Sequence, residues 1–138
     1  MKNTTKKQYA LFCSGNIKAA LDAGCIKEIL EKIEVSEILF APVSVKGITG
    51  YNGAIIPVFD LSGSYSRFPG RESSGSITAV ITTTKGTAAI LFDSFNGMGT
   101  GDDIKNTQSS PFLQEVIIND LNYSFVDPEM LVSTGFFK

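Results

Sequence analysis

The chain has 138 residues, a net charge of −2, two cysteines and no histidine. The missing histidine removes the usual general base, the Ser-His-Asp and Cys-His arrangements and most catalytic zinc sites, so we expect no enzyme, metal or cofactor. The sequence has no basic block typical of nucleic-acid binding, no run of about 18 apolar residues and no stretch that resembles a secretory signal. We therefore expect one cytoplasmic domain over residues 1–138.

The first predicted strand covers Gln8–Cys13 and ends at the turn-forming Ser14-Gly15-Asn16, and residues 17–21 return as a second strand. Cys13 and Cys25 both lie among apolar residues. Buried thiols are more common than disulfides in cytosolic proteins, so we expect these cysteines to be buried and unpaired.

Residues 22–34 fit two structures. Apolar side chains at positions 26, 29, 30 and 33 have the spacing of one face of an amphipathic helix, with Asp22 as its N-cap. Two turns of periodicity are weak support, because short isolated helices are marginal. The other structure is a short helical turn that runs into a strand, and we favour it on the family resemblance given below. Ala41-Pro42 ends the segment, since the residue before a proline avoids the helical conformation.

The most informative segment is residues 45–61, V-K-G-I-T-G-Y-N-G-A-I-I-P-V-F-D-L. Asn52-Gly53 favours a type I′ turn, in which both central residues take positive φ, so the segment is predicted to be a tight β-hairpin. Its return strand is apolar on both faces, which predicts a position inside a barrel or sandwich. Pro57 lacks a backbone N–H and is expected at an edge or a bulge.

The rest of the chain alternates between strand-like and loop-like stretches. Strands are predicted at residues 77–84, 87–92, 112–118 and 122–126, and polar, glycine-rich loops at residues 62–76 and 96–111. Asp60 and Asp93 each end an apolar strand, where an aspartate usually caps a turn by accepting backbone N–H bonds. Short strands at regular spacing indicate an all-β barrel or sandwich.

The hairpin resembles the signature of CheW-like domains, the coupling adaptors of bacterial chemotaxis. The matching positions are Val45, Gly47, Ile48, Gly53, Ile55, Ile56, Pro57, Val58, Asp60 and Leu61. The resemblance implies an all-β fold of two small five-stranded, SH3-like barrels packed around a shared core, with a short helical turn and no catalytic site.

The resemblance also implies partners. Members of the family bridge the cytoplasmic tip of a chemoreceptor and the regulatory domain of the histidine kinase CheA, without direct membrane contact. By analogy, the first barrel's surface with Glu28 faces the kinase, and a groove near Ile26, Gly47 and the Tyr51–Asn52 turn faces the receptor helix. The expected partner-binding residues are Ile26, Glu28, Leu30, Gly47, Thr49, Tyr51, Asn52 and Gly53.

Two departures from the family pattern leave a second function open. The family turn is usually Asn-Leu-Arg-Gly, so Asn52 stands in place of an arginine that contacts a partner, and Glu115 replaces a usual glycine. The alternative is a CheW-like module of a different signalling scaffold that has lost one contact. A third hypothesis, a phosphate or cation site at residues 97–103, is disfavoured because the spacing of the glycines and acids fits neither kind of loop, and we expect a flexible turn there.

Overall fold

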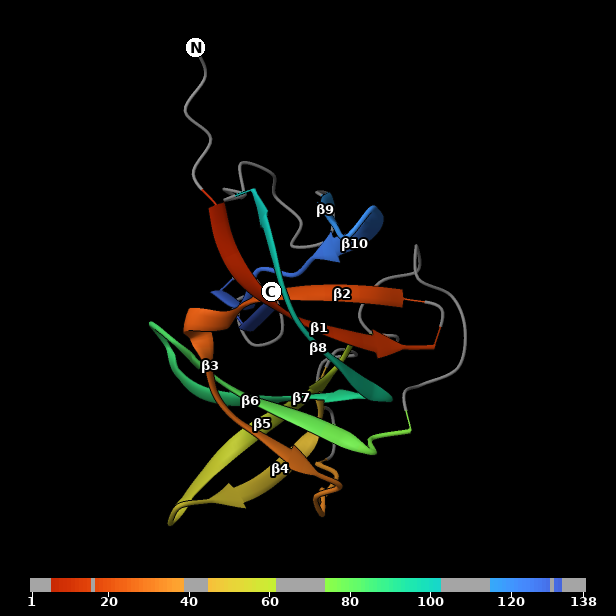
Figure 1. Ribbon diagram of the computed structural model, residues 1–138. Coiled ribbons are helices and arrows are strands. Elements are labelled where there is room, and N and C mark those ends of the chain that lie inside the picture. Colours follow the sequence, from red (N-terminus) through yellow and green to blue (C-terminus); the bar gives the residue numbers. More distant parts are fainter. Residues whose placement is uncertain are drawn as a thin grey trace.

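The computed structural model describes residues 6–15, 17–38, 45–61, 74–102, 115–129 and 131–132. Two five-stranded sheets lie one above the other (Figure 1). The terminal barrel, whose strands come from both ends of the chain, has the strand order β8-β1-β2-β10-β9, and the central barrel has the order β3-β6-β7-β5-β4. The expected all-β fold of two five-stranded units is confirmed.

The strands of the terminal barrel are β1 (Lys6–Ser14), β2 (Ile17–Asp22), β8 (Ser94–Asp102), β9 (Glu115–Ile118) and β10 (Leu121–Phe125). Those of the central barrel are β3 (Ile26–Glu31), β4 (Val45–Tyr51), β5 (Ala54–Asp60), β6 (Ile77–Thr83) and β7 (Gly86–Phe92). In each barrel, two antiparallel hairpins meet through one parallel pair, β2–β10 or β5–β7, and a fifth strand completes the sheet. The two barrels therefore share one strand order.

The chain has one apolar core inside each barrel and a third core shared between the two barrels. On β1, Tyr9 and Leu11 point into the terminal barrel, whereas Ala10 and Phe12 point into a core shared by the two sheets. The return strand β5 alternates in the same way between the interior of the central barrel and the shared core. Strands buried on both faces need apolar residues on both faces, which explains the unbroken apolar runs of the sequence.

Residues 22–34 do not form the amphipathic helix that their periodicity allows. Asp22 caps only the 3₁₀ turn η1 (Ala23–Cys25), by accepting a 2.8 Å bond from the Gly24 N–H, and β3 follows directly. The four apolar residues serve two cores instead of one helix face. Ile26 and Ile29 pack against the shared core, and Leu30 and Ile33 pack against the core of the central barrel. The favoured structure, a helical turn that runs into a strand, is confirmed.

The glycine-rich stretch predicted as a loop is a strand, and that prediction is wrong for residues 96–102. β8 and β9 are the two edges of the terminal sheet, and they contact each other. A Cβ on Gly99 would lie 2.3 Å from Ile118 Cγ2, and one on Gly101 would lie 2.8 Å from Val116 Cγ2. The glycines therefore let the side chains of β9 pack onto β8 and close the barrel.

Most predicted turns are confirmed. Asn52 and Gly53 have φ of 49° and 81°, as a type I′ turn requires, and Asn119-Asp120 forms a second turn with two positive φ angles between β9 and β10. Pro57 pairs with Ile48 on β4, one residue before the pairing of β5 with β7 begins. The proline therefore lies at a local edge of the sheet, where its missing N–H costs no ladder bond.

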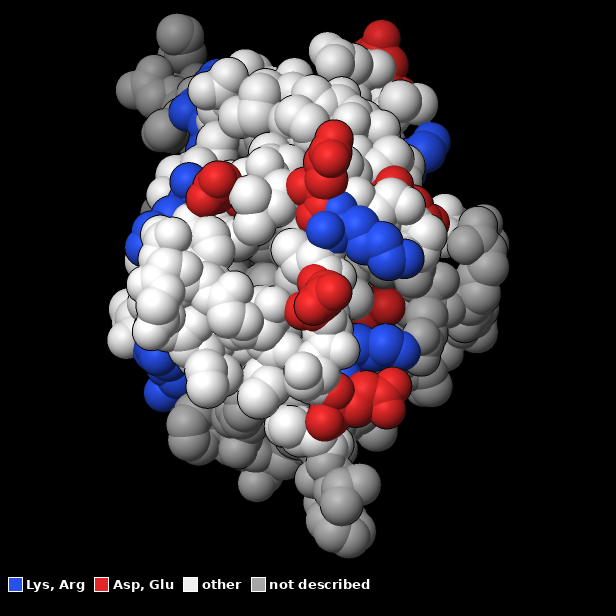
Figure 2. All heavy atoms as spheres, turned by 90° about the horizontal axis from the view of Figure 1, so that it is seen from below, with Lys and Arg blue, Asp and Glu red and all other residues white. Residues whose placement is uncertain are grey.

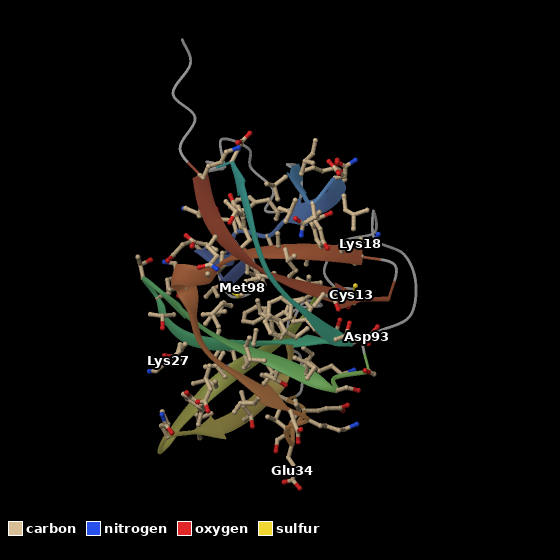
Figure 3. The ribbon with its side chains drawn as sticks, viewed as in Figure 1. Cys13, Lys18, Lys27, Glu34, Asp93 and Met98 are labelled. Carbon is tan, nitrogen blue, oxygen red and sulfur yellow. The ribbon has the colours of Figure 1, made fainter. Side chains whose placement is uncertain are left out.

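Asp93 joins the two barrels instead of capping a local turn. Its carboxylate accepts bonds from the backbone N–H groups of Gly15, at 2.6 Å, and Ser74, at 2.5 Å, and its own N–H donates to the Cys13 carbonyl at 2.7 Å (Figure 3). Asp60 is buried. The structural role expected for Asp93 is supported, but its partners are distant in the sequence.

Both cysteines are unpaired, as predicted, although each is only half-buried. Burial raises the pKa of the Cys25 thiol from 9.0 to about 12, and the nearby charge of Asp22 adds to the effect. Several other predictions concern residues outside the described ranges, namely most of the 62–76 loop, residues 103–114 and the end of the chain after residue 132. Within the described ranges, no helix is long and apolar enough to cross a membrane.

Candidate partner-binding site

The central barrel closes along a seam between β4 and the chain that follows β3. Ser36 and Ile48 exchange two backbone hydrogen bonds, both 2.9 Å long, and the Thr49 hydroxyl donates to the Glu34 carbonyl at 2.7 Å. Gly47 is buried at this seam, where a Cβ would lie 2.3 Å from the Ser36 carbonyl oxygen. The seam thus depends on a glycine in β4, as the terminal barrel depends on glycines in β8.

Tyr51 crosses the same seam at the mouth of the barrel. Its half-buried ring packs against the core of the central barrel, and its hydroxyl donates to Glu28 Oε1 at 2.5 Å. Glu28 pairs with Val80, whose side chain points into the barrel, so the carboxylate stands above the barrel core. Tyrosine suits this position because it joins an apolar ring to a polar tip.

A β-bulge brings a cation to the same place. The register of β3 against β6 shifts between Ile26 and Glu28, so Lys27 is the extra residue of a bulge. Bulges re-aim side chains, and here the Lys27 ammonium lies 5.8 Å from the centre of the Tyr51 ring. Consecutive residues of β3 therefore both reach Tyr51, one through its hydroxyl and the other through its ring.

The electrostatics of the site follow from this contact. The hydrogen bond to the Glu28 carboxylate raises the pKa of the Tyr51 phenol, because it stabilises the neutral form, and burial and the negative charge act in the same direction. Seen from the central-barrel end, acidic and basic side chains interleave in one band (Figure 2). At Tyr51 itself, the Glu28 carboxylate and the Lys27 ammonium supply one charge of each sign.

The structure places the predicted site residues in two groups. It brings Glu28 and Tyr51 into contact, next to the exposed Asn52-Gly53 turn. The other four members have packing or seam contacts: Ile26 at the shared core, Leu30 at the barrel core, and Gly47 and Thr49 at the seam. Gly47 is buried, so it offers no surface of its own to a partner.

Sequence reasoning missed three exposed apolar residues. Ile55 is 74% exposed at the end of the β4–β5 hairpin. It lies on the same face of β5 as Phe59, which is buried in the shared core. Phe95 and Met98 on β8 are 37% and 45% exposed and pair with Phe12 and Ala10, so they extend the shared core to the surface. The alternation of side chains along β5 identifies Ile55 as an outward-facing residue. The glycine-rich pattern of β8 predicts a loop, so it gives no signal for Phe95 or Met98.

Among the described residues, no group of three or more side chains could hold a metal ion. Lys6 pairs with Asp102 at 2.8 Å, so the acid at the end of β8 has a structural partner. The described surface offers the fixed carboxylate of Glu28 and the exposed apolar side chains of Ile55, Phe95 and Met98.

Comparisons with known proteins agree with this architecture. A family model of the CheW-like domain matches residues 8–133. Among solved structures, the scaffolding protein TtCheW from Thermoanaerobacter tengcongensis superposes with a TM-score of 0.72 at 18% identity, over 94% of this chain and 89% of that chain. The search of curated proteins finds no match. Because the family model covers most of the sequence, the chain belongs to the CheW-like domain family.

Proposed function

We propose that this protein is a non-enzymatic scaffold that couples a chemoreceptor to a CheA-type histidine kinase. The observation that carries the proposal is the preformed Glu28–Tyr51 contact beside an exposed hairpin, in a chain of the CheW-like family. The absence of histidine from the whole sequence supports a role without catalysis.

The kinase contact is assigned to the central barrel, around Ile55 and Glu28. An isoleucine that is 74% exposed at a hairpin end contributes little to the fold and can serve as a buried anchor in a complex. The outer face of the hairpin also holds the half-buried Ile48 and Pro57. Apolar anchors supply most of the affinity, and rim charges such as Glu28 supply register and specificity.

We assign the receptor contact to the open rim of the shared core and not to the groove expected near Gly47 and the Tyr51–Asn52 turn, because Gly47 is buried and Tyr51 contacts Glu28. Phe95 and Met98 are exposed there on β8, and Ile26 and Ile29 of β3 pack partly against the same core. In Figure 3, Met98 lies at the level where the two sheets meet. An amphipathic helix with apolar residues at helical spacing can cover such a rim, which is how helical partners usually dock.

Calorimetric titration against the regulatory domain of the same organism's CheA-type kinase tests the kinase contact. Saturable one-to-one binding is expected, with Ile55→Ser weakening it about 10- to 100-fold, the cost of one buried aliphatic side chain. Ile117→Ser, at a 66% exposed isoleucine on the terminal barrel, is the matched control and is expected to bind as the wild type does. Absence of wild-type binding at tens of micromolar contradicts the proposal.

The alternative function is a CheW-like module of another signalling scaffold. Asn52 favours it, because an asparagine offers neither the charge nor the donor fork of the arginine usual at this position. Neighbouring genes distinguish the two functions: genes for chemoreceptors and a CheA-type kinase support the first, and their absence supports the second.

A further inference from the structure

We propose that Tyr51 is a positioning residue that determines partner specificity, by holding the Glu28 carboxylate so that its second oxygen meets a lysine or arginine of the kinase domain. This inference rests on the proposed function, because it names the chemistry that the same surface recognises. The resemblance places the Tyr51–Asn52 turn at the receptor contact, and the hydrogen bond from Tyr51 to Glu28 is the reason to place Tyr51 at the kinase contact instead.

The first step is the rigidity of Tyr51. It is the last residue of β4 and pairs with Ala54 across the Asn52-Gly53 turn, so its backbone is fixed by the hairpin. Its ring packs against the apolar core of the central barrel. A hydroxyl held on such a ring can fix a flexible glutamate before a partner arrives, and this reduces the entropy that binding costs.

The second step is the hydrogen bonding of Glu28. Its Oε1 accepts the Tyr51 hydroxyl bond, and among the described residues Oε2 has no hydrogen bond and the carboxylate has no ion pair. Lys27 is the adjacent residue, yet its ammonium lies over the Tyr51 ring, 5.8 Å from the ring centre. The tyrosine therefore separates the neighbouring charges and leaves an exposed carboxylate oxygen for an external cation.

The third step is the chemistry of the partner. An exposed carboxylate oxygen in a fixed position accepts a charge-assisted hydrogen bond from a lysine or arginine, and disfavours an acidic residue at the same place. Within the described ranges, the Asn52-Gly53 turn adds no charge beside it. The partner surface that fits is basic opposite Glu28 and apolar opposite Ile55.

The test is a double-mutant cycle in the full chain, titrated by calorimetry against the kinase regulatory domain. Tyr51→Phe and Glu28→Gln are each expected to weaken binding about 3- to 10-fold, and Tyr51→Phe to have no further effect when Glu28→Gln is present. Glu31→Gln, at another exposed glutamate of β3, is the matched control and is expected to change affinity less than about twofold.

A second readout separates positioning from a general structural effect. NMR measures the chemical shift of the Tyr51 ring carbon as a function of pH. The signal is assigned by its absence from the spectrum of Tyr51→Phe. Its raised pKa is expected to fall toward the ordinary phenol value in Glu28→Gln, while the urea midpoints of both variants stay at the wild-type value.

Each outcome has one meaning. If the wild type does not bind the kinase domain, both the proposed function and this assignment are overturned. If the wild type binds and Tyr51→Phe binds equally well, or if the two substitutions are additive, the assignment alone is overturned. Coupled losses that shrink at high salt support a cationic partner group, whereas coupled losses that are independent of salt refute one.

Discussion

The closing seam of the central barrel gives the sharpest prediction about folding. Gly47 has no left-handed φ, and the close approach of Val35 and Ser36 explains a glycine at this position. In Gly47→Ala the new Cβ would meet the Ser36 carbonyl oxygen at 2.3 Å, the Val35 methyl carbon Cγ1 at 2.8 Å and the Ser36 carbonyl carbon at 2.9 Å. Two of these atoms belong to the backbone, so no rotamer change relieves the clash.

The magnitude follows from what must move. Separating Ser36 from Ile48 removes two backbone hydrogen bonds, worth about 0.5–1.5 kcal/mol each, and forced overpacking costs about 1–3 kcal/mol where the strands stay together. We expect Gly47→Ala to lower the free energy of unfolding by about 2–4 kcal/mol. With a urea m-value of roughly 2 kcal/mol per molar, the unfolding midpoint then falls by about 1–2 M.

Gly50 provides the matched control on the same strand. It is exposed, its backbone φ is ordinary, and a Cβ there would meet no atom of the described residues within 4 Å. Gly50→Ala is therefore expected to be neutral or stabilising by up to about 1 kcal/mol, because alanine restricts the unfolded chain. Urea unfolding followed by circular dichroism measures both variants. Equal effects of the two substitutions, within about 0.5 kcal/mol, would refute the close-approach argument.

Three further predictions concern single side chains. Among the described residues, the buried Thr78 hydroxyl has no hydrogen-bond partner, so Thr78→Val should raise Tm by about 2–5 °C in calorimetry, and a lower Tm would mean that the hydroxyl has a partner. The contribution of the Cys25 thiol to stability should be constant below pH 9 and fall toward pH 12, because the thiol ionises in the unfolded chain while burial keeps it protonated in the folded protein; Cys25→Ala should reduce this slope in urea titrations at each pH. Asn52→Arg should cost about 1 kcal/mol in unfolding free energy, because asparagine tolerates its φ of 49° better, and an unchanged urea midpoint would contradict this argument.

The sequence predicted the elements whose signals are local. Asn52-Gly53 specified its turn, because both residues accept positive φ, and the runs that became β6 and β7 were unbroken β-branched and apolar stretches. The strand pairs needed no knowledge of distant contacts. Family resemblance then supplied the number of strands and the division into two barrels.

The wrong predictions have a different cause, because they depend on how the edges of each sheet meet when the barrel closes. The glycines of β8 suggested a loop because the reason for them lies in Ile118 and Val116, on a strand that comes later in the chain. The helical spacing in residues 26–33 suggested one apolar face, because nothing local shows that a strand with a bulge packs on two cores. Contacts between sheet edges decide both cases, and no pattern within a short window records them.

The candidate site has the same origin. Tyr51 and Glu28 are 23 residues apart, and their hydrogen bond exists only because β3 and β4 are the two edges of one sheet that closes on itself. The terminal barrel closes by apolar packing over Gly99 and Gly101, whereas the seam of the central barrel is crossed by backbone bonds, the Thr49 hydroxyl and finally the Tyr51 phenol. The Tyr51 hydroxyl at the end of the central seam holds the Glu28 carboxylate in place at the surface. The aliphatic side chains that close the terminal barrel have no hydrogen-bonding group that could do the same. Two barrels with one strand order are therefore closed by different chemistry, one by apolar packing and the other by hydrogen bonds.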